Sequence, residues 1–333
     1  MRRVSELIPS EGIGPGKCPF KEKNNRLNIV ALGDVGSILL TGLRLMGGDV
    51  IQSIGIFDAN EKTAQRFEIE MNQIGWPFED CQMNSLPFVE KISEEQLFDC
   101  DVFVFCASRG VPSVGATGDV RMAQLEANRK IVEYYALMAK QRDFRGMFAV
   151  VSDPVDPLCK AALKTSGLMP CQVEGFGLGV MNMRARYYAM RDKRFNSYLT
   201  EGRAFGPHGS DLVIANSIEN YDDELSRQLT DITVKANLEI RELGFKPYFA
   251  PALSSGAISL LLMLRKQWHF SSIFFGEAFL GIKNRMTDEG PEFEDIPLPD
   301  ELFARIEVAY RNLCQLEKKS EGNSEEKNET SGC

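Results

Sequence analysis

Short runs of strand-like composition alternate with longer helical patterns along the first half of the chain. The strand-like runs cover residues 27–32, 51–57, 101–106 and 146–151. Helical patterns of apolar positions lie between them, at 36–45, 61–73 and 119–141. The run DVFVFC at 101–106 is apolar almost throughout, which is typical of a strand buried on both faces. This alternation predicts an α/β fold in which helices connect the strands of a parallel sheet.

After Gly175 the pattern changes to short strands mixed with long helices, one of them expected over 211–243. We therefore predict a Rossmann-type doubly wound parallel sheet over 26–172, followed by an α+β substrate domain over 173–318. Residues 1–25 are polar and aperiodic, and residues 319–333 are charged and of low complexity. Both ends of the chain are therefore expected to be disordered.

Composition narrows the class of partner. The 333 residues carry a net charge of -9 without a clustered basic face, which argues against nucleic acid. No apolar run has the length of a membrane span, and the first residues lack the apolar segment of a signal peptide, so no membrane contact and a cytoplasmic location are expected. The eight cysteines show no Cys-x-x-Cys pairing, which indicates reduced, mostly structural thiols and no metal site. A small molecule is the expected partner.

The first strand, the turn and helix after it, and the second strand carry the pattern of a dinucleotide-binding unit. The turn contains Gly33, Val35 and Gly36, and Asp58 ends the second strand. Glycines let the backbone approach a pyrophosphate, while an acid at Asp58 accepts hydrogen bonds from ribose hydroxyls and repels a 2′-phosphate. The sequence therefore predicts that these four residues bind NAD. Ala31 stands where the full pattern has its first glycine, so a residue with a methyl group must make the first turn.

The chain has only two histidines, and histidine is the side chain best suited to exchanging a proton near neutral pH. His208 lies in GPHGSD, where turn-forming residues would present the imidazole from a loop. His269 lies in an apolar run and is expected to be a partly buried structural residue. A histidine in a turn is by itself more often structural than catalytic, so the interpretation of His208 depends on the rest of the chain.

With the dinucleotide unit and His208, the chain resembles the lactate/malate dehydrogenase family of NAD-dependent 2-hydroxyacid dehydrogenases. The resemblance runs from about residue 28 to about residue 316. CASRGVPSVGATGDVRMAQLEANRKIV is similar to the family's mobile active-site loop and the helix after it, with Arg121 and Asn128 in the places of an arginine and an asparagine seven residues apart. VSDPVDPL, which contains Asp153, is similar to the segment that closes over nicotinamide and substrate.

Three later segments continue the resemblance. GFGLGVMNMRARYY is similar to the segment with the substrate-carboxylate arginine, here Arg184. GPHGSD is similar to the turn of the catalytic histidine, here His208, and ALSSGAIS to the segment whose hydroxyl contacts substrate, here Ser254.

The resemblance implies a hydride transfer between NAD and a small 2-hydroxy or 2-oxo acid. His208 would take or return the hydroxyl proton, Arg121 would polarise the carbonyl, and Arg184 would hold the substrate carboxylate. Asn128 would belong to the cofactor-binding residues. The family's habit also implies a homodimer or homotetramer.

Two positions depart from the family pattern. The family has an aspartate that supports the histidine three residues before the carboxylate-binding arginine, and Met181 stands there. A small shift would bring Asn182 to the ring, where an amide could orient it without supplying negative charge. Asp153 stands where the family has asparagine. It could take over the support of His208, the substrate could carry a cationic group, or the site could have stopped catalysing; the sequence leaves these alternatives open.

The loop before Arg121 also differs. The position that sets substrate class in the family falls near Gly115, and the loop is longer by about two residues. No second arginine lies in this stretch, and Arg109 precedes it. Malate is therefore not directly supported, and the acid stays unnamed.

Two other functions remain open at this point. A nucleotide-binding protein without turnover, acting as a sensor or assembly partner, would explain the departures at Ala31, Met181 and Asp153. An NAD- and metal-dependent glycosidase on a related fold would use Cys171 and His208 as metal ligands.

Overall fold

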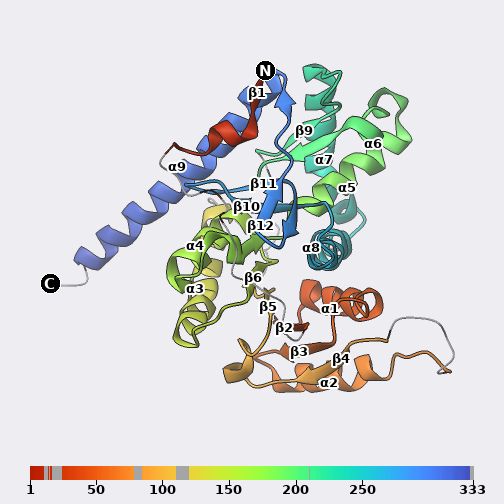
Figure 1. Ribbon diagram of the computed structural model, residues 1–333, viewed down its shortest axis with the longest axis vertical. Coiled ribbons are helices and arrows are strands. Elements are labelled where there is room, and N and C mark those ends of the chain that lie inside the picture. Colours follow the sequence, from red (N-terminus) through yellow and green to blue (C-terminus); the bar gives the residue numbers. More distant parts are fainter. Residues whose placement is uncertain are drawn as a thin grey trace.

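The computed structural model describes residues 1–10, 14, 16, 25–78, 85–109, 120–209 and 211–330, with side chains at all of these except 120–124 and 317–330. Its centre is a sheet that has nine strands within these residues (Figure 1). Six of the strands are parallel and lie in the order β7-β6-β5-β2-β3-β4. Their bounds are β2 Arg26–Val30, β3 Ser53–Phe57, β4 Phe88–Lys91, β5 Val102–Phe105, β6 Met147–Val150 and β7 Val173–Gly175. The predicted doubly wound α/β architecture is confirmed.

The sheet continues beyond β7 with antiparallel strands from the second half of the chain. They are β10 His269–Phe274, β11 Phe279–Thr287 and β12 Gly290–Phe293. Ser272 of β10 is the register partner of Gly175 of β7, so one sheet runs through both halves. The boundary expected between 172 and 173 falls immediately before a strand of the parallel sheet, and the second half is not a separate layer. A separate two-stranded sheet of β8 Arg203–Phe205 and β9 Val213–Ala215 packs beside β11.

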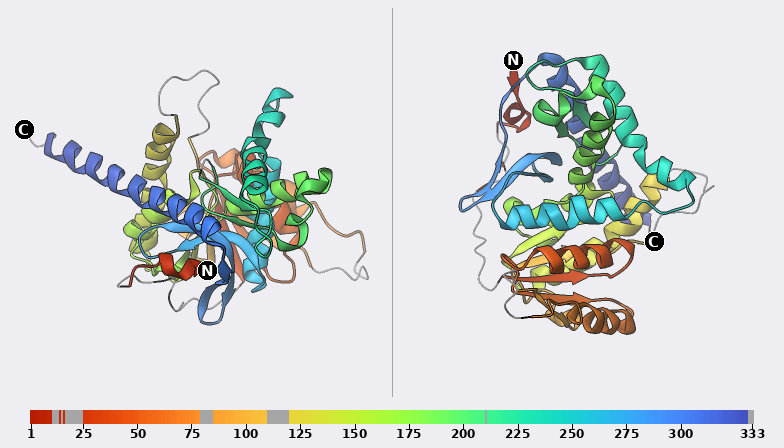
Figure 2. Two further views of the ribbon diagram at one scale, coloured as in Figure 1. Left: turned by 90° about the horizontal axis from the view of Figure 1, so that it is seen from above. Right: turned by 90° about the vertical axis from the view of Figure 1, so that its right-hand side faces the viewer.

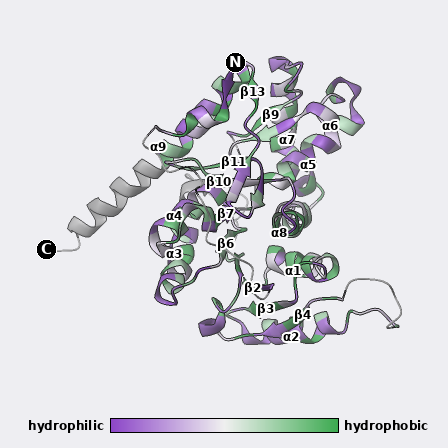
Figure 3. Cartoon of the chain, in the orientation of Figure 1, coloured by the Kyte–Doolittle hydropathy of each residue, from purple (hydrophilic) through white to green (hydrophobic). Residues whose placement is uncertain are grey.

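Helices cover both faces of the parallel strands, as the turned views show (Figure 2). One face packs against α1 Asp34–Met46, α2 Glu61–Asn72 and α8 Ile258–Leu264. The other packs against α3 Val120–Gln141 and α4 Val155–Ser166. Hydrophobic residues gather along the central strands, whereas the outer helices alternate between hydrophobic and hydrophilic residues (Figure 3). This is the pattern of strands buried on both faces beneath amphipathic helices.

A further helical layer lies beside the antiparallel strands. It contains α5 Leu178–Arg191, α6 Tyr198–Glu201, α7 Asp223–Glu242 and a π-helix at Pro251–Ala257. The single helix expected over 211–243 is wrong in its first third, where β9 forms. α7 begins only at Asp223, because the Asp222 carboxylate accepts a hydrogen bond from the Leu225 N–H (2.9 Å) and caps the helix.

Both expectations of disordered ends need correction. β1 Arg2–Arg3 pairs with β13 Pro297–Leu298, and the following 3₁₀ turn Val4–Leu7 buries Val4 completely. At the other end, α9 Asp300–Thr330 continues helical through most of the segment expected to be disordered. Lysine and glutamate have good helix propensity, which is the physical reason a charged segment can extend a helix. No helix in the described part of the chain is long and apolar enough to cross a membrane.

Candidate active site

The candidate site lies where a doubly wound sheet opens a crevice, at the carboxyl ends of its strands. The chain leaves β2 and β5 in opposite directions along the sheet order, and this switch point is where ligands bind in such folds. A cavity of about 150 Å³ lies here. It is lined by Ser108 after β5, Asp153 after β6, Gly177 after β7 and His208 after β8.

The turn after β2 has the geometry expected of a nucleotide-binding turn. Ala31 adopts a left-handed backbone conformation (φ 71°), as a glycine normally would at this place. A Cβ on Gly36 would come within 2.0 Å of the Ala31 carbonyl oxygen, so only glycine allows this close packing. A Cβ on Gly33 would meet nothing within 4 Å, and Gly33 caps the N-terminus of α1. The backbone N–H groups at this helix end are therefore open to an anionic ligand.

Asp58 and Val35 complete the cofactor side of the crevice. The two Asp58 carboxylate oxygens accept hydrogen bonds from the Leu32 and Asn60 N–H groups, each at 2.8 Å. These bonds fix the carboxylate beside the glycine turn and leave lone pairs for ribose hydroxyls. Val35 lines the same cavity as His208. The residues present therefore fit NAD in the place where the sequence predicts it.

The His208 imidazole lies beside the Asp153 carboxylate in the wall of the cavity. The Nδ1 atom of His208 lies 3.3 Å from Oδ1 of Asp153. The other ring nitrogen, Nε2, is buried and has no hydrogen-bond partner among the described residues. Asp153 thus holds the proton on Nδ1 and leaves Nε2 to exchange one with a ligand. Of the alternatives left open by the sequence, the geometry favours Asp153 as the support of His208.

A second carboxyl group, Asp156, lies close to this pair. It is buried at the start of α4, where Oδ1 accepts a hydrogen bond from the Ser272 hydroxyl (2.6 Å). Burial raises the pKa of Asp156 to about 7, although the Ser272 hydrogen bond and the positive form of His208 oppose this shift. The sequence analysis did not single out Asp156. Its only signal there was a position three residues after Asp153 in VSDPVDPL.

Arg184 extends from α5 next to the cavity. Burial lowers the pKa of Arg184, and the negative charge of Asp153 partly opposes that effect. Its Nη1 atom lies 3.4 Å from the sulfur of Met181, which is itself fully buried in the core around α5. A thioether is a weak acceptor, so the guanidinium keeps its capacity to bind a carboxylate. Met181 serves the packing of α5.

Three of the predicted site residues are not among those that line the His208 cavity. The Asn182 side-chain oxygen accepts a hydrogen bond from the Tyr198 hydroxyl (2.9 Å), which ties it to α6. Asn128 is fully buried. Its amide binds the Arg109 N–H (2.9 Å) and the Asp153 carbonyl (2.7 Å), and it therefore positions the two loops that carry the site.

The third of these residues is Ser254, which was predicted to contact substrate through its hydroxyl group. Ser255, not Ser254, lines the cavity with His208. The Ser255 hydroxyl donates to the Gly177 carbonyl (2.6 Å) and accepts from the Val180 N–H (2.8 Å), so it anchors the start of α5. Neighbouring serines in a segment that forms a π-helix cannot be assigned to a face by α-helical spacing.

Two expectations lie outside the described residues. The backbone of Arg121 belongs to the first turn of α3, but its side chain is outside the description, as is all of Gly115. Arg109 is described and exposed, and its N–H contacts Asn128.

Cys171, the other metal ligand considered beside His208, precedes β7, whereas the cavity begins after that strand. No group of three potential metal ligands occurs within the described residues.

Comparison with known proteins agrees with this geometry. The chain is 28% identical over 197 residues to an L-lactate dehydrogenase of Treponema denticola, a match that covers 59% of each protein. It is also 28% identical over 197 residues to the L-lactate dehydrogenase of Mycoplasma genitalium, covering 57% of this chain and 58% of that one. The chain is a divergent homologue of the lactate/malate dehydrogenases. The matched region spans about three fifths of these curated relatives. No protein-family model matches the chain.

Solved structures show the same fold over more of the chain. The minor L-lactate dehydrogenase of Enterococcus mundtii in its ligand-bound form superposes with a TM-score of 0.73 at 19% identity, covering 88% of this chain and 98% of that one. The malate dehydrogenase of Picrophilus torridus in its apo form gives 0.72 at 17% identity, with 91% and 99% covered. The lactate/malate dehydrogenase fold of this homologue is thus retained where its sequence has diverged.

Proposed function

We propose that the protein is an NAD-dependent oxidoreductase that moves a hydride between the cofactor and a small 2-hydroxy or 2-oxo acid. The observation that carries the proposal is the His208–Asp153 pair, with Nδ1 at 3.3 Å from a carboxylate oxygen and Nε2 without a hydrogen-bond partner among the described residues. The similarity to L-lactate dehydrogenases supports the same reaction class.

The proposed reaction balances with the groups at the site. NAD, when bound along Gly33, Gly36 and Asp58, supplies the acceptor or donor of the hydride. In the oxidising direction, the C2–H bond of the hydroxy acid breaks with its electron pair, and His208 Nε2 removes the hydroxyl proton as the carbonyl forms. In the reducing direction, His208 returns that proton to the carbonyl oxygen. Arg184 holds the substrate carboxylate, which fixes C2 beside the imidazole.

Asp153 makes this proton exchange favourable in two ways. It favours the ring tautomer with the proton on Nδ1 and a free lone pair on Nε2, and its negative charge stabilises an imidazolium formed during the reaction. The Asp153 side chain is 55% exposed, so water screens that charge unless the site closes around substrate. The Asp153 carboxylate also interacts electrostatically with the Arg184 guanidinium. This positive charge partly compensates Asp153 and so reduces its repulsion of a substrate carboxylate.

The proposal is tested by NADH oxidation across a panel of 2-oxo acids. We expect turnover by the wild-type protein, and a loss of about 100-fold or more in His208→Gln, which removes the general acid. Asp153→Asn should retain the ring's orientation but lower the rate at least tenfold, because an imidazolium formed in the reaction loses its counter-charge. NADH binding, followed by fluorescence, should be similar in all three proteins.

Two results would contradict the proposed function. Turnover of no acid by the wild-type protein, with NADH still bound, would leave a nucleotide-binding protein without dehydrogenase activity. Turnover that is unaffected by His208→Gln would remove His208 from the chemistry.

A further inference from the structure

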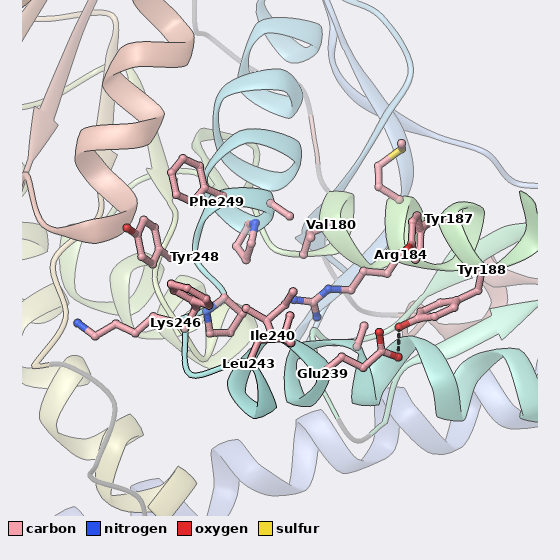
Figure 4. A pocket seen from close by; sticks show the side chains of 16 residues that line it. Val180, Arg184, Tyr187, Tyr188, Glu239, Ile240, Leu243, Lys246, Tyr248 and Phe249 are labelled. Carbon is pink, nitrogen blue, oxygen red and sulfur yellow. Dashed lines mark hydrogen bonds between the residues drawn. The ribbon is translucent and has the colours of Figure 1, made fainter. Parts of the chain in front are cut away.

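A larger pocket adjoins the His208 cavity. Its volume is about 600 Å³, and it lies between α5, the C-terminal end of α7 and the segment 245–251. Val180 and Pro251 line both the pocket and the His208 cavity, so the two spaces share a wall. Figure 4 shows the Arg184 side chain reaching from α5 into the pocket, toward Ile240 and Leu243. A ligand whose carboxylate binds Arg184 therefore has the catalytic imidazole on one side and this pocket on the other.

The wall of the pocket is mainly aromatic and aliphatic. α5 contributes Tyr187 and Tyr188, and α7 contributes Ile240. The segment after α7, with the sequence GFKPYFAP, contributes Phe245, Tyr248 and Phe249. Phe245 and Phe249 are 71% and 58% exposed, so apolar surface at the pocket is left in contact with water. Binding of an apolar group over these large side chains would remove their surface from water, which favours binding.

The charges in the pocket suit one carboxylate and not two. The Glu239 carboxylate accepts a hydrogen bond from the Tyr188 hydroxyl (2.7 Å), and Lys246 is paired with Asp34 (2.9 Å). Arg184 has no carboxylate of the described residues within 4.0 Å of its guanidinium, which instead contacts the Met181 sulfur. A second carboxylate on the ligand would meet the negative Glu239, with no unpaired cation among the described lining residues to receive it.

We propose that the substrate is a 2-hydroxy or 2-oxo monocarboxylic acid with a large apolar side chain, most favourably an aromatic one. This inference rests on the proposed function. It assigns the pocket to the part of the substrate that begins at C3. The methyl group of pyruvate would leave most of the 600 Å³ to water, whereas a phenyl or indole ring would bury the aromatic wall. The second carboxylate of oxaloacetate would be repelled.

A binding experiment tests the pocket without any chemistry. 3-Phenylpropanoate and propanoate both carry a carboxylate and lack a reactive carbonyl, and they differ only by the ring. By calorimetry, we expect 3-phenylpropanoate to bind the wild-type protein at least tenfold more tightly. Ala236→Phe, which fills the pocket from α7, should remove this preference, while the same substitution at exposed Ala304 on α9 should preserve it.

A turnover experiment separates the pocket from the proposed function. With NADH, kcat/KM should be at least tenfold higher for phenylpyruvate than for pyruvate or oxaloacetate, and Ala236→Phe should narrow that ratio. Preference for pyruvate or oxaloacetate would overturn the inference while the dehydrogenase function stands. A ring preference in binding without any turnover would refute the proposed function and leave the pocket assignment in place.

Equal binding of the two non-reactive acids would also overturn the inference. So would the absence of binding by either, which is the result expected if a second copy of the chain filled the pocket.

Discussion

Ala31 holds a backbone conformation that ordinarily belongs to glycine. Its φ of 71° lies in the left-handed region, where a Cβ crowds the neighbouring carbonyl. The Ala31 N–H still donates to the Phe57 carbonyl (2.9 Å), and Gly36 still packs against the Ala31 carbonyl. The turn is therefore complete but strained. Strain of this kind is a cost to stability that the chain carries at a ligand site.

We predict that Ala31→Gly stabilises the protein by about 1 kcal/mol, because glycine adopts positive φ without the steric penalty. Urea unfolding followed by circular dichroism measures the change. The matched control is Ala304→Gly at an exposed position of α9, where loss of helix propensity should cost about 1 kcal/mol. An equal destabilisation by both substitutions would show that the left-handed turn at Ala31 carries no strain.

Asp156 makes stability depend on pH in the opposite sense to most carboxylates. Its pKa is raised from an ordinary value of 3.8 to about 7, so between these values the folded protein binds a proton that the unfolded chain releases. The stabilising contribution of the protonated carboxyl is therefore complete below about pH 4 and is lost as pH rises through 7. Each pKa unit corresponds to about 1.4 kcal/mol, so the effect amounts to a few kcal/mol.

We predict that Asp156→Asn removes this loss, since an amide keeps an acceptor for Ser272 and cannot ionise. Urea unfolding at pH 5 and pH 8 should show the variant gaining stability relative to wild type at the higher pH. His208 and Asp153 face the same carboxyl group in both proteins, so the comparison is made between variant and wild type at each pH. Asp143→Asn, at a side chain 79% exposed, is the control and should show no such gain. An identical pH dependence in Asp156→Asn and wild type would refute the raised pKa.

At the scale of elements, a buried polar cluster joins the parallel and antiparallel parts of the sheet. His269 on β10 donates from one ring nitrogen to the Gln267 carbonyl (3.0 Å) and faces Glu174 on β7 with the other (2.8 Å). The Gln267 carbonyl can only accept, so one ring nitrogen of His269 carries a proton, and a further proton lies between the other nitrogen and the Glu174 carboxyl group. Both side chains are essentially inaccessible to water. The Ser271 hydroxyl also donates to Glu174 (2.7 Å).

Removing one partner of this buried pair leaves the other polar group without compensation. We predict that His269→Ala destabilises the protein by about 3–5 kcal/mol. The double variant His269→Leu with Glu174→Leu should cost less than the sum of its single variants, because it removes both polar groups together. Urea unfolding of the set measures this coupling. Strict additivity would show that the pair acts only through its packing.

For the whole molecule, the sequence predicted those strands and turns that are determined by residues close together in the chain. Continuous apolar runs located β2, β3, β5 and β6, because strands buried on both faces need them. The run FVEK of β4 was missed, since an edge strand of four residues has little apolar signal. The glycine turn and Asp58 were found because their spacing is local.

The missed parts depend on contacts between distant segments. Asp153 and His208 are 55 residues apart, so only the folded chain could show which carboxylate or amide meets the ring. The aromatic pocket was missed for the same reason, because its wall is assembled from two helices and a connecting segment. The first ten residues were included in the segment expected to be disordered. Their buried apolar side chains, Val4 and Leu7, are too few to show the periodicity of a helix or a strand.

Those first residues have a consequence for the order in which the protein is made. Val4 belongs to the same core as Leu302 and Phe303, and the Arg2 guanidinium lies 3.9 Å from the centre of the Phe303 ring. This segment is synthesised long before α9 and must therefore wait until α9 has been made before it can dock. Until then, the apolar faces of β10 and β11 in this core stay open, and this interval of synthesis is when the nascent chain is most exposed to aggregation.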